Sequence, residues 1–135
     1  PCNLVTQQPQ KPVLQAYTME DWQLDFEWLQ VQHQVKDAMQ RETLPDLNTV
    51  LFLIGIQELG RWKRKFAKEE KQDLMHIAVC RLLANDGYFD FVGRDEDGWP
   101  HYRQVRELSS QDMQQQERLL KINAVRYFKD LEEEK

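Results

Sequence analysis

One apolar segment, residues 46–59, constrains the fold of this 135-residue chain more than any other. Its apolar side chains are Leu47, Val50, Leu51, Phe52, Leu53, Ile54, Ile56 and Leu59. Pro45 interrupts any preceding helix, and Asp46 or Asn48 can accept hydrogen bonds from the first amides of a new one. The length of the run and the terminal Gly60 favour a helix over a buried strand. Because a helix that is apolar on nearly every side must be enclosed, we expect this one at the centre of a helical domain.

Three further segments show helical periodicity. Residues 19–42 carry one apolar face, on which Leu24, Trp28, Val31 and Val35 recur at helical spacing. Residues 68–85 are apolar around most of their circumference and stop before Gly87, a residue suited to a left-handed helix terminus. A last helix starts at Ser109 or Ser110. The segments 46–59 and 68–85 are joined by a short link, which predicts an antiparallel helix pair.

The segment GYFDFVGRDEDGWPHYR, residues 87–103, has aromatic and acidic residues around turn-forming glycines. It predicts a β-hairpin over about residues 88–105, with Pro100 at an edge position because proline lacks a ladder donor. The fold class we expect is mainly α: a single-domain bundle of about four helices with a small β-hairpin before the last helix. Residues 1–17 hold Pro9 and Pro12 and should form an extended N-terminal segment, so the single helical domain is expected over residues 18–135.

The composition is that of a soluble globular protein, with 41% hydrophobic and 30% charged residues. The net charge of −5 disfavours wholesale wrapping of a polyanion. The most apolar run, residues 50–56, is shorter than the ~20 residues that span a bilayer, so we expect no membrane segment. Cys2 and Cys80 do not force a disulfide, which favours a reducing, cytoplasmic setting. The size and style of the chain are typical of a bacterial domain.

The hairpin is the first candidate surface. Trp99, His101 and Tyr102 form an aromatic patch that can contact a partner or ligand, since rigid aromatic rings give much contact area at low entropic cost. Asp95 and Asp97 of the acidic turn belong to the same candidate surface. The turn acids also resemble part of a calcium loop, but the ligand spacing is incomplete, and a solvated acidic turn is the better interpretation.

The second candidate is a basic segment over residues 61–71 with interleaved Trp62 and Phe66. Arg61, Lys63, Arg64 and Lys65 are its anion-binding candidates, because clustered cations beside aromatic rings can hold phosphates and stack bases. A helix followed by a hairpin also has the order of a winged helix. Against this, the helix over 68–85 is too apolar to lie in a groove and the hairpin tip is acidic.

The third candidate is a weak metal set formed by Asp73, His76 and Glu58. Carboxylates and histidines projecting into a bundle can form a di-metal site, but the second Glu-x-x-His pair of such sites is missing. Structural ion pairs such as Glu58 with Arg61 are the better explanation. Cys80 should be an inert buried thiol, and we expect no cofactor.

The sequence therefore favours a non-enzymatic protein-interaction domain that binds a protein partner or associates with itself. A nucleic-acid-binding protein that uses the 61–71 segment is the alternative. A small metal-dependent enzyme is the third hypothesis.

Overall fold

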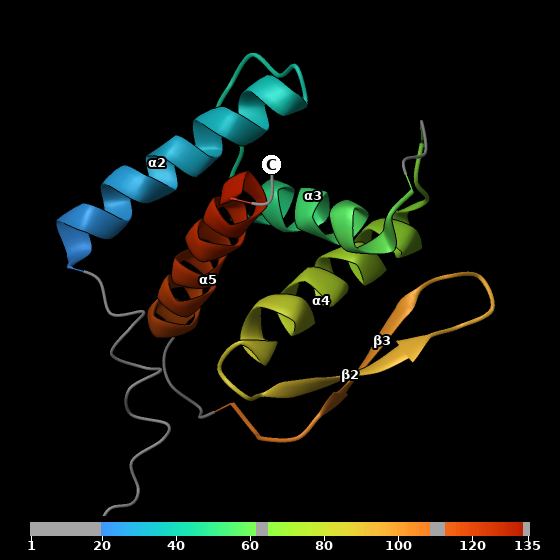
Figure 1. Cartoon of the computed structure of the whole chain (residues 1–135). Helices are drawn as coiled ribbons and strands as arrows, with labels where there is room; N and C mark the ends of the chain where they lie inside the picture. The colour runs from blue at the N-terminus through green and yellow to red at the C-terminus, as the bar shows by residue number, and fades with distance from the viewer. Residues whose placement is uncertain (1–19, 62–64, 109–112, 134–135) are drawn as a thin grey trace, which may run out of the picture.

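The computed structural model describes residues 20–61, 65–108 and 113–133. Its helices are α2 (Asp21–Ala38), α3 (Leu47–Leu59), α4 (Lys68–Ala84) and α5 (Met113–Glu133), and its strands are β2 (Phe89–Arg94) and β3 (Pro100–Gln104). The two strands form an antiparallel hairpin that precedes the last helix (Figure 1). This confirms the predicted mainly α fold with a small hairpin. The extended segment predicted for residues 1–17 and the caps predicted at Ser109 and Ser110 lie outside the described residues.

The apolar helix α3 begins and ends as its flanking residues predict. Asp46 is the N-cap, and its Oδ1 accepts a hydrogen bond from the Thr49 amide at 2.9 Å. This bond lowers the pKa of the Asp46 carboxyl. Gly60 adopts a left-handed φ of 81°, and its amide donates to the Ile56 carbonyl. Within α3, Val50 and Ile54 are completely buried, which places the helix at the centre of the molecule.

Helices α3 and α4 cross at very short range. Figure 1 shows α4 turning back beneath α3 after the connecting segment. A Cβ atom added at Gly55 would lie only 2.2 Å from the carbonyl oxygen of Leu74. The crossing therefore requires glycine at this position of α3 because the opposing atom belongs to the α4 backbone.

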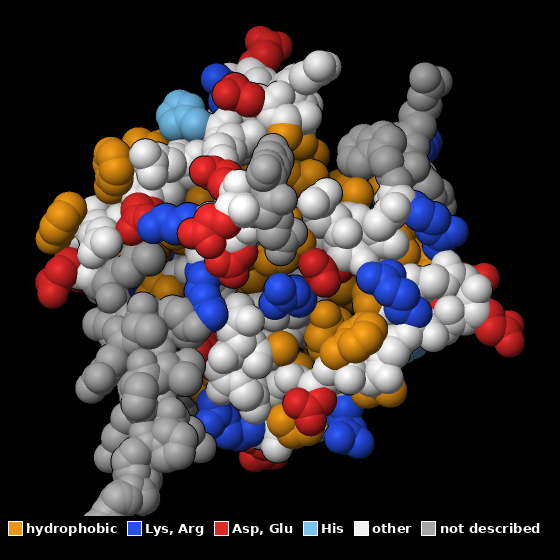
Figure 2. All heavy atoms as spheres, in the orientation of Figure 1, with side chains coloured by type: hydrophobic (Ala, Val, Ile, Leu, Met, Phe, Trp, Pro, Cys, Tyr) orange, Lys and Arg blue, Asp and Glu red, His pale blue; other side chains and the backbone are white. Residues whose placement is uncertain are grey.

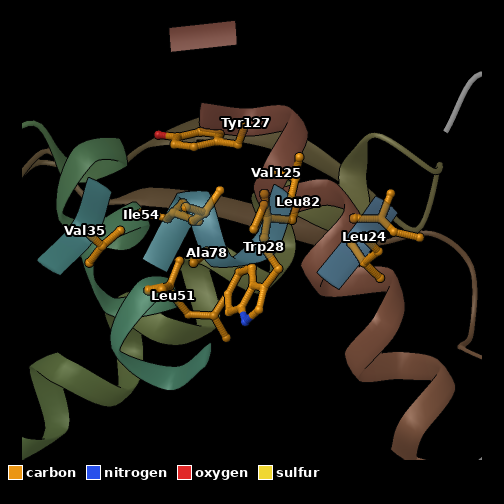
Figure 3. Packing of buried hydrophobic residues seen from close by; sticks show 13 residues of the cluster. Leu24, Trp28, Val35, Leu51, Ile54, Ala78, Leu82, Val125 and Tyr127 are labelled. Atoms are coloured by element: carbon orange, nitrogen blue, oxygen red, sulfur yellow. The ribbon is translucent and has the colours of Figure 1, made fainter. Parts of the chain in front are cut away.

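The main core joins all four helices. The side chains labelled in Figure 3 are Leu24, Trp28, Val35, Leu51, Ile54, Ala78, Leu82, Val125 and Tyr127. Tyr127 of α5 also donates a hydrogen bond from its hydroxyl to Glu58 Oε2 at 2.7 Å. Glu58 Oε1 lies 3.5 Å from Arg81 Nε. The ion pair of Glu58 is thus with Arg81 of α4, so the predicted pairing with Arg61 is wrong, and Glu58 links three helices instead.

Helix α2 is shorter than the predicted span of residues 19–42. It ends at Ala38 because Gln40 takes a left-handed φ of 55°. The Gln40 amide donates to the Asp37 carbonyl and the Arg41 amide to the Lys36 carbonyl, which is a Schellman motif. Sequence patterns place glycine at such a position, so a glutamine there gave no signal for the helix end.

The face of the molecule drawn in Figure 2 shows no extended region of one charge sign among the described residues. In Figure 2, acidic and basic side chains alternate over the visible face, with apolar side chains between them. Within the described part of the chain, no helix combines the length and apolarity that crossing a bilayer requires.

Candidate functional site

The β-hairpin packs on α4 through one of its faces. Phe91 of β2 lies opposite Tyr102 of β3, and the register shifts between Phe91 and Gly93, as in a β-bulge. Phe89 is buried beside Cys80 and Leu83 of α4. Tyr102 is half-buried and contacts the same helix. Phe91 stays more than half exposed although its ring contacts that of Tyr102, so the packing on α4 covers only part of this face of the hairpin.

Two arginines hold the hairpin turn against the end of α3. Arg94 donates to the Gly98 carbonyl at 2.8 Å and to the Glu58 carbonyl at 2.7 Å. Arg61 donates to the Asp97 carbonyl at 2.6 Å. The Glu58 carbonyl belongs to the last turn of α3, where carbonyls lack helical partners and the dipole attracts cations. No local sequence pattern marks Arg94 for this role, and Arg61 is predicted from the sequence as an anion-binding candidate.

The carboxylate of Asp95 organises the turn itself. Its Oδ1 accepts hydrogen bonds from the amides of Asp97 at 2.9 Å and Trp99 at 3.0 Å. Its Oδ2 lies 2.9 Å from Nε2 of His101. The bond with His101 is the main cause that lowers the pKa of Asp95, and the Trp99 amide adds to it. Both oxygens are therefore engaged by donors of the hairpin, which favours the acidic-turn interpretation over a calcium loop.

A cleft of about 340 Å³ lies between α4 and the hairpin. Its lining residues are Asp73, His76, Ile77 and Cys80 of α4, and Asp95, Trp99, Pro100, His101 and Tyr102 of the hairpin. The hairpin patch and the Asp73–His76 pair thus lie in one cleft, although they are separate candidates in the sequence. Asp97 and Glu58 do not line this cleft: the Asp97 carbonyl binds Arg61, and Glu58 binds Tyr127 and Arg81.

The cleft combines aromatic walls with carboxylates. Trp99 and Tyr102 are half-buried, and both pack against core residues of α3 and α4. Burial raises the pKa of the Tyr102 hydroxyl, so this wall is neutral at physiological pH. Asp73 is exposed, and its carboxylate has no hydrogen bond or ion pair within the described residues. The walls are therefore held in place by packing, while one acidic group remains available.

The cleft is also lined by a Cys–His pair whose thiol is not activated as a nucleophile. Cys80 Sγ lies 3.5 Å from Nε2 of His76. Burial raises the pKa of the Cys80 thiol to about 11, so the nucleophilic thiolate is disfavoured. This agrees with the predicted inert thiol. Among the residues that the structure describes, no three His, Cys, Asp or Glu side chains are arranged to hold a metal ion.

The basic segment is only partly described. Lys63 and Arg64 lie outside the described residues, and Lys65 is exposed. The role of the basic segment in anion binding stays a prediction.

No protein-family model, curated protein or solved structure matches the chain. Function must therefore be inferred from the geometry of the cleft and the chemistry of its walls.

Proposed function

We propose that this chain is a non-enzymatic interaction domain that binds a partner protein by taking one of its basic side chains into the cleft between α4 and the hairpin. The observation that supports this proposal is the combination of packed aromatic walls, Trp99 and Tyr102, with the Asp73 carboxylate, which has no partner among the described residues, at the same cleft. The partner is a different protein or, in the self-association form of the proposal, a second copy of this chain.

The chemistry of the cleft favours a cation over other side chains. A lysine ammonium or arginine guanidinium is attracted to the faces of tryptophan and tyrosine. The same group can pair with Asp73, which has no other partner within the described residues. The volume of about 340 Å³ is at the low end of ligand clefts, which suits one long side chain. The net charge of −5 also favours a basic partner.

Other functions receive less support from these residues. The Cys80 thiol is buried with a pKa of about 11, which disfavours nucleophilic catalysis. Nucleic-acid binding by the 61–71 segment is weakened because Arg61 is bonded to the Asp97 carbonyl. The carboxylates of Asp73 and Asp95 would also repel phosphates at the cleft.

The test uses the purified chain as bait in a lysate of its source organism, with quantitative mass spectrometry of the captured proteins. Asp73→Lys reverses the charge at the cleft, and Gln72→Lys is the matched control because Gln72 is the exposed neighbour outside the cleft lining. We expect that wild type and the Gln72→Lys variant capture the same partner protein and that the Asp73→Lys variant fails to capture it. Titration of that purified protein should show at least about a tenfold weaker Kd for Asp73→Lys.

Three results would contradict the proposal. Equal capture by both lysine variants would remove the cleft from the interaction. If the captured proteins are lost after nuclease treatment, and the chain shifts the mobility of nucleic acid at low salt, the nucleic-acid alternative would be favoured. Capture of nothing, with a monomeric mass by light scattering at high concentration, would exclude both the hetero- and the self-associating form.

A further inference from the structure

A second hollow, of about 320 Å³, lies between α2 and α5, on elements that do not line the first cleft. Glu27 and Gln34 of α2 and Phe128, Lys129 and Glu132 of α5 are among its lining residues. Glu27 is only 7% exposed, although it is charged. We call this hollow the α2–α5 groove.

The buried carboxylate of Glu27 is only half satisfied. Its Oε1 is ion-paired with the ammonium group of Lys129. Its Oε2 is buried and has no hydrogen-bond partner in residues 20–61, 65–108 and 113–133. A buried carboxylate oxygen without a donor is costly, because it has lost its water and gained no hydrogen bond. Oε2 therefore lacks a donor among the described residues, although Glu27 lines a hollow from which a donor could approach.

A guanidinium group meets that requirement better than the ammonium that is present. Arginine presents a planar fork of N–H donors that binds both oxygens of a carboxylate, whereas lysine acts as a point charge. Lys129 can give way, because its side chain is 57% exposed. Glu132, three residues further along α5, is within reach of its ammonium group on the same helix face.

We propose that the α2–α5 groove binds the guanidinium group of an arginine side chain from a partner, which pairs with both oxygens of Glu27 and displaces Lys129 toward Glu132. Val31 and Val125 give the arginine stem an apolar surface, and Phe128 lies beside it. The groove shares Gln34, Phe128 and Glu132 with an adjacent hollow of about 680 Å³ that includes Leu53 and Leu131. Residues that flank the arginine can pack there.

The test is an NMR titration of the full ¹⁵N-labelled chain with N-acetyl-arginine amide and, separately, N-acetyl-lysine amide at constant ionic strength. We expect saturable shifts for the backbone amides around Glu27 and Lys129 and for the side-chain amides of Gln30 and Gln34. The arginine probe should bind about tenfold more tightly than the lysine probe, the equivalent of one additional charge-assisted hydrogen bond. No saturable shift up to about 50 mM, or equal affinity for both probes, would overturn the proposal.

Three variants separate the site from unspecific charge effects. Glu27→Gln should lose the preference for arginine, and Glu117→Gln should keep it, because Glu117 is a second lysine-paired carboxylate that does not line the groove. Lys129→Arg keeps the positive charge and supplies the fork from within the chain, so it should abolish probe binding and raise Tm. If the Lys129→Arg variant binds the arginine probe as wild type does, the proposal is refuted. This outcome decides the question even if the Glu27→Gln variant fails to fold.

Discussion

Replacing Gly55 by alanine should destabilise the domain, although alanine is the better helix former. Helix propensity alone predicts a gain of about 1 kcal/mol for Gly→Ala inside a helix. The α3–α4 crossing predicts the opposite. The new Cβ would lie 2.2 Å from the Leu74 carbonyl oxygen, about 1.2 Å closer than the 3.4 Å at which ordinary contact begins, and 2.7 Å from the carbonyl carbon.

The magnitude follows from what would have to move. The two nearest atoms of Leu74 belong to the α4 backbone, and the third, Cβ at 2.9 Å, is fixed to that backbone, so no rotamer change can relieve the contact and the two helices must separate. Overpacking a core typically costs about 1–3 kcal/mol. A rigid backbone contact belongs at the upper end of that range, and after the propensity gain we expect a net loss of about 2 kcal/mol. For a domain of this size the Tm should fall by roughly 10 °C.

Urea denaturation followed by circular dichroism at 222 nm measures this loss. Gly60→Ala is the control, because no atom of the described residues lies within 4 Å of a Cβ there and the left-handed φ of 81° is what alanine would strain. It should cost about 1 kcal/mol. Leu74→Ala should not rescue Gly55→Ala, because the collision is with the Leu74 backbone. A Gly55→Ala protein as stable as wild type, or a rescue by Leu74→Ala, would refute the close crossing.

Three further predictions concern single residues. Gln40→Gly should raise the free energy of unfolding by about 1 kcal/mol in urea titrations, because glycine takes the left-handed φ of 55° without strain; an unchanged or lower stability would contradict the Schellman end of α2. Asp46→Ala should cost about 1 kcal/mol at pH 7. Since the folded-state pKa of Asp46 is lowered, this difference from wild type should be complete above about pH 5 and shrink as the pH falls below about 4, and a difference independent of pH would count against the carboxylate cap. In a Cys2→Ser background, Cys80 should not react with Ellman's reagent in the native state at pH 8, where a pKa of about 11 leaves about one thiol in a thousand ionised; fast native-state labelling would show an activated thiol instead.

The predictable part of the fold is the part with strong local signals. Helix α3 has a capping aspartate before it, a glycine after it and apolar residues between, and both ends were predicted within a residue. Helix α2 ends early because a glutamine occupies the left-handed position, and no common sequence pattern marks glutamine there. Local signals of this kind predict elements well and unusual termini poorly.

The candidate site was predictable residue by residue but not as an arrangement. Side-chain chemistry alone marks Trp99, His101 and Tyr102 as candidates, and likewise Asp73 and His76. Their meeting in one cleft depends on how the hairpin packs on α4. That packing relies on backbone carbonyls, which accept from Arg94 and Arg61 and leave no mark in the sequence. The burial of Glu27 is likewise not encoded in a local pattern. A charged residue beside an apolar stripe is predicted to be exposed, because the sequence does not show that a second helix covers it.

The two proposed sites depend on different helix contacts, which makes them separable. The cleft wall on α4 begins with Asp73, adjacent to the Leu74 backbone that Gly55 approaches. A larger residue at Gly55 that pushes α4 away from α3 must therefore displace Asp73 relative to α3, while Arg94 and Arg61 keep the hairpin turn bonded near the end of α3. The α2–α5 groove contains no α4 residue. A folded Gly55→Ala protein should thus bind the partner at the cleft more weakly and keep its preference for the arginine probe, whereas Lys129→Arg should do the reverse.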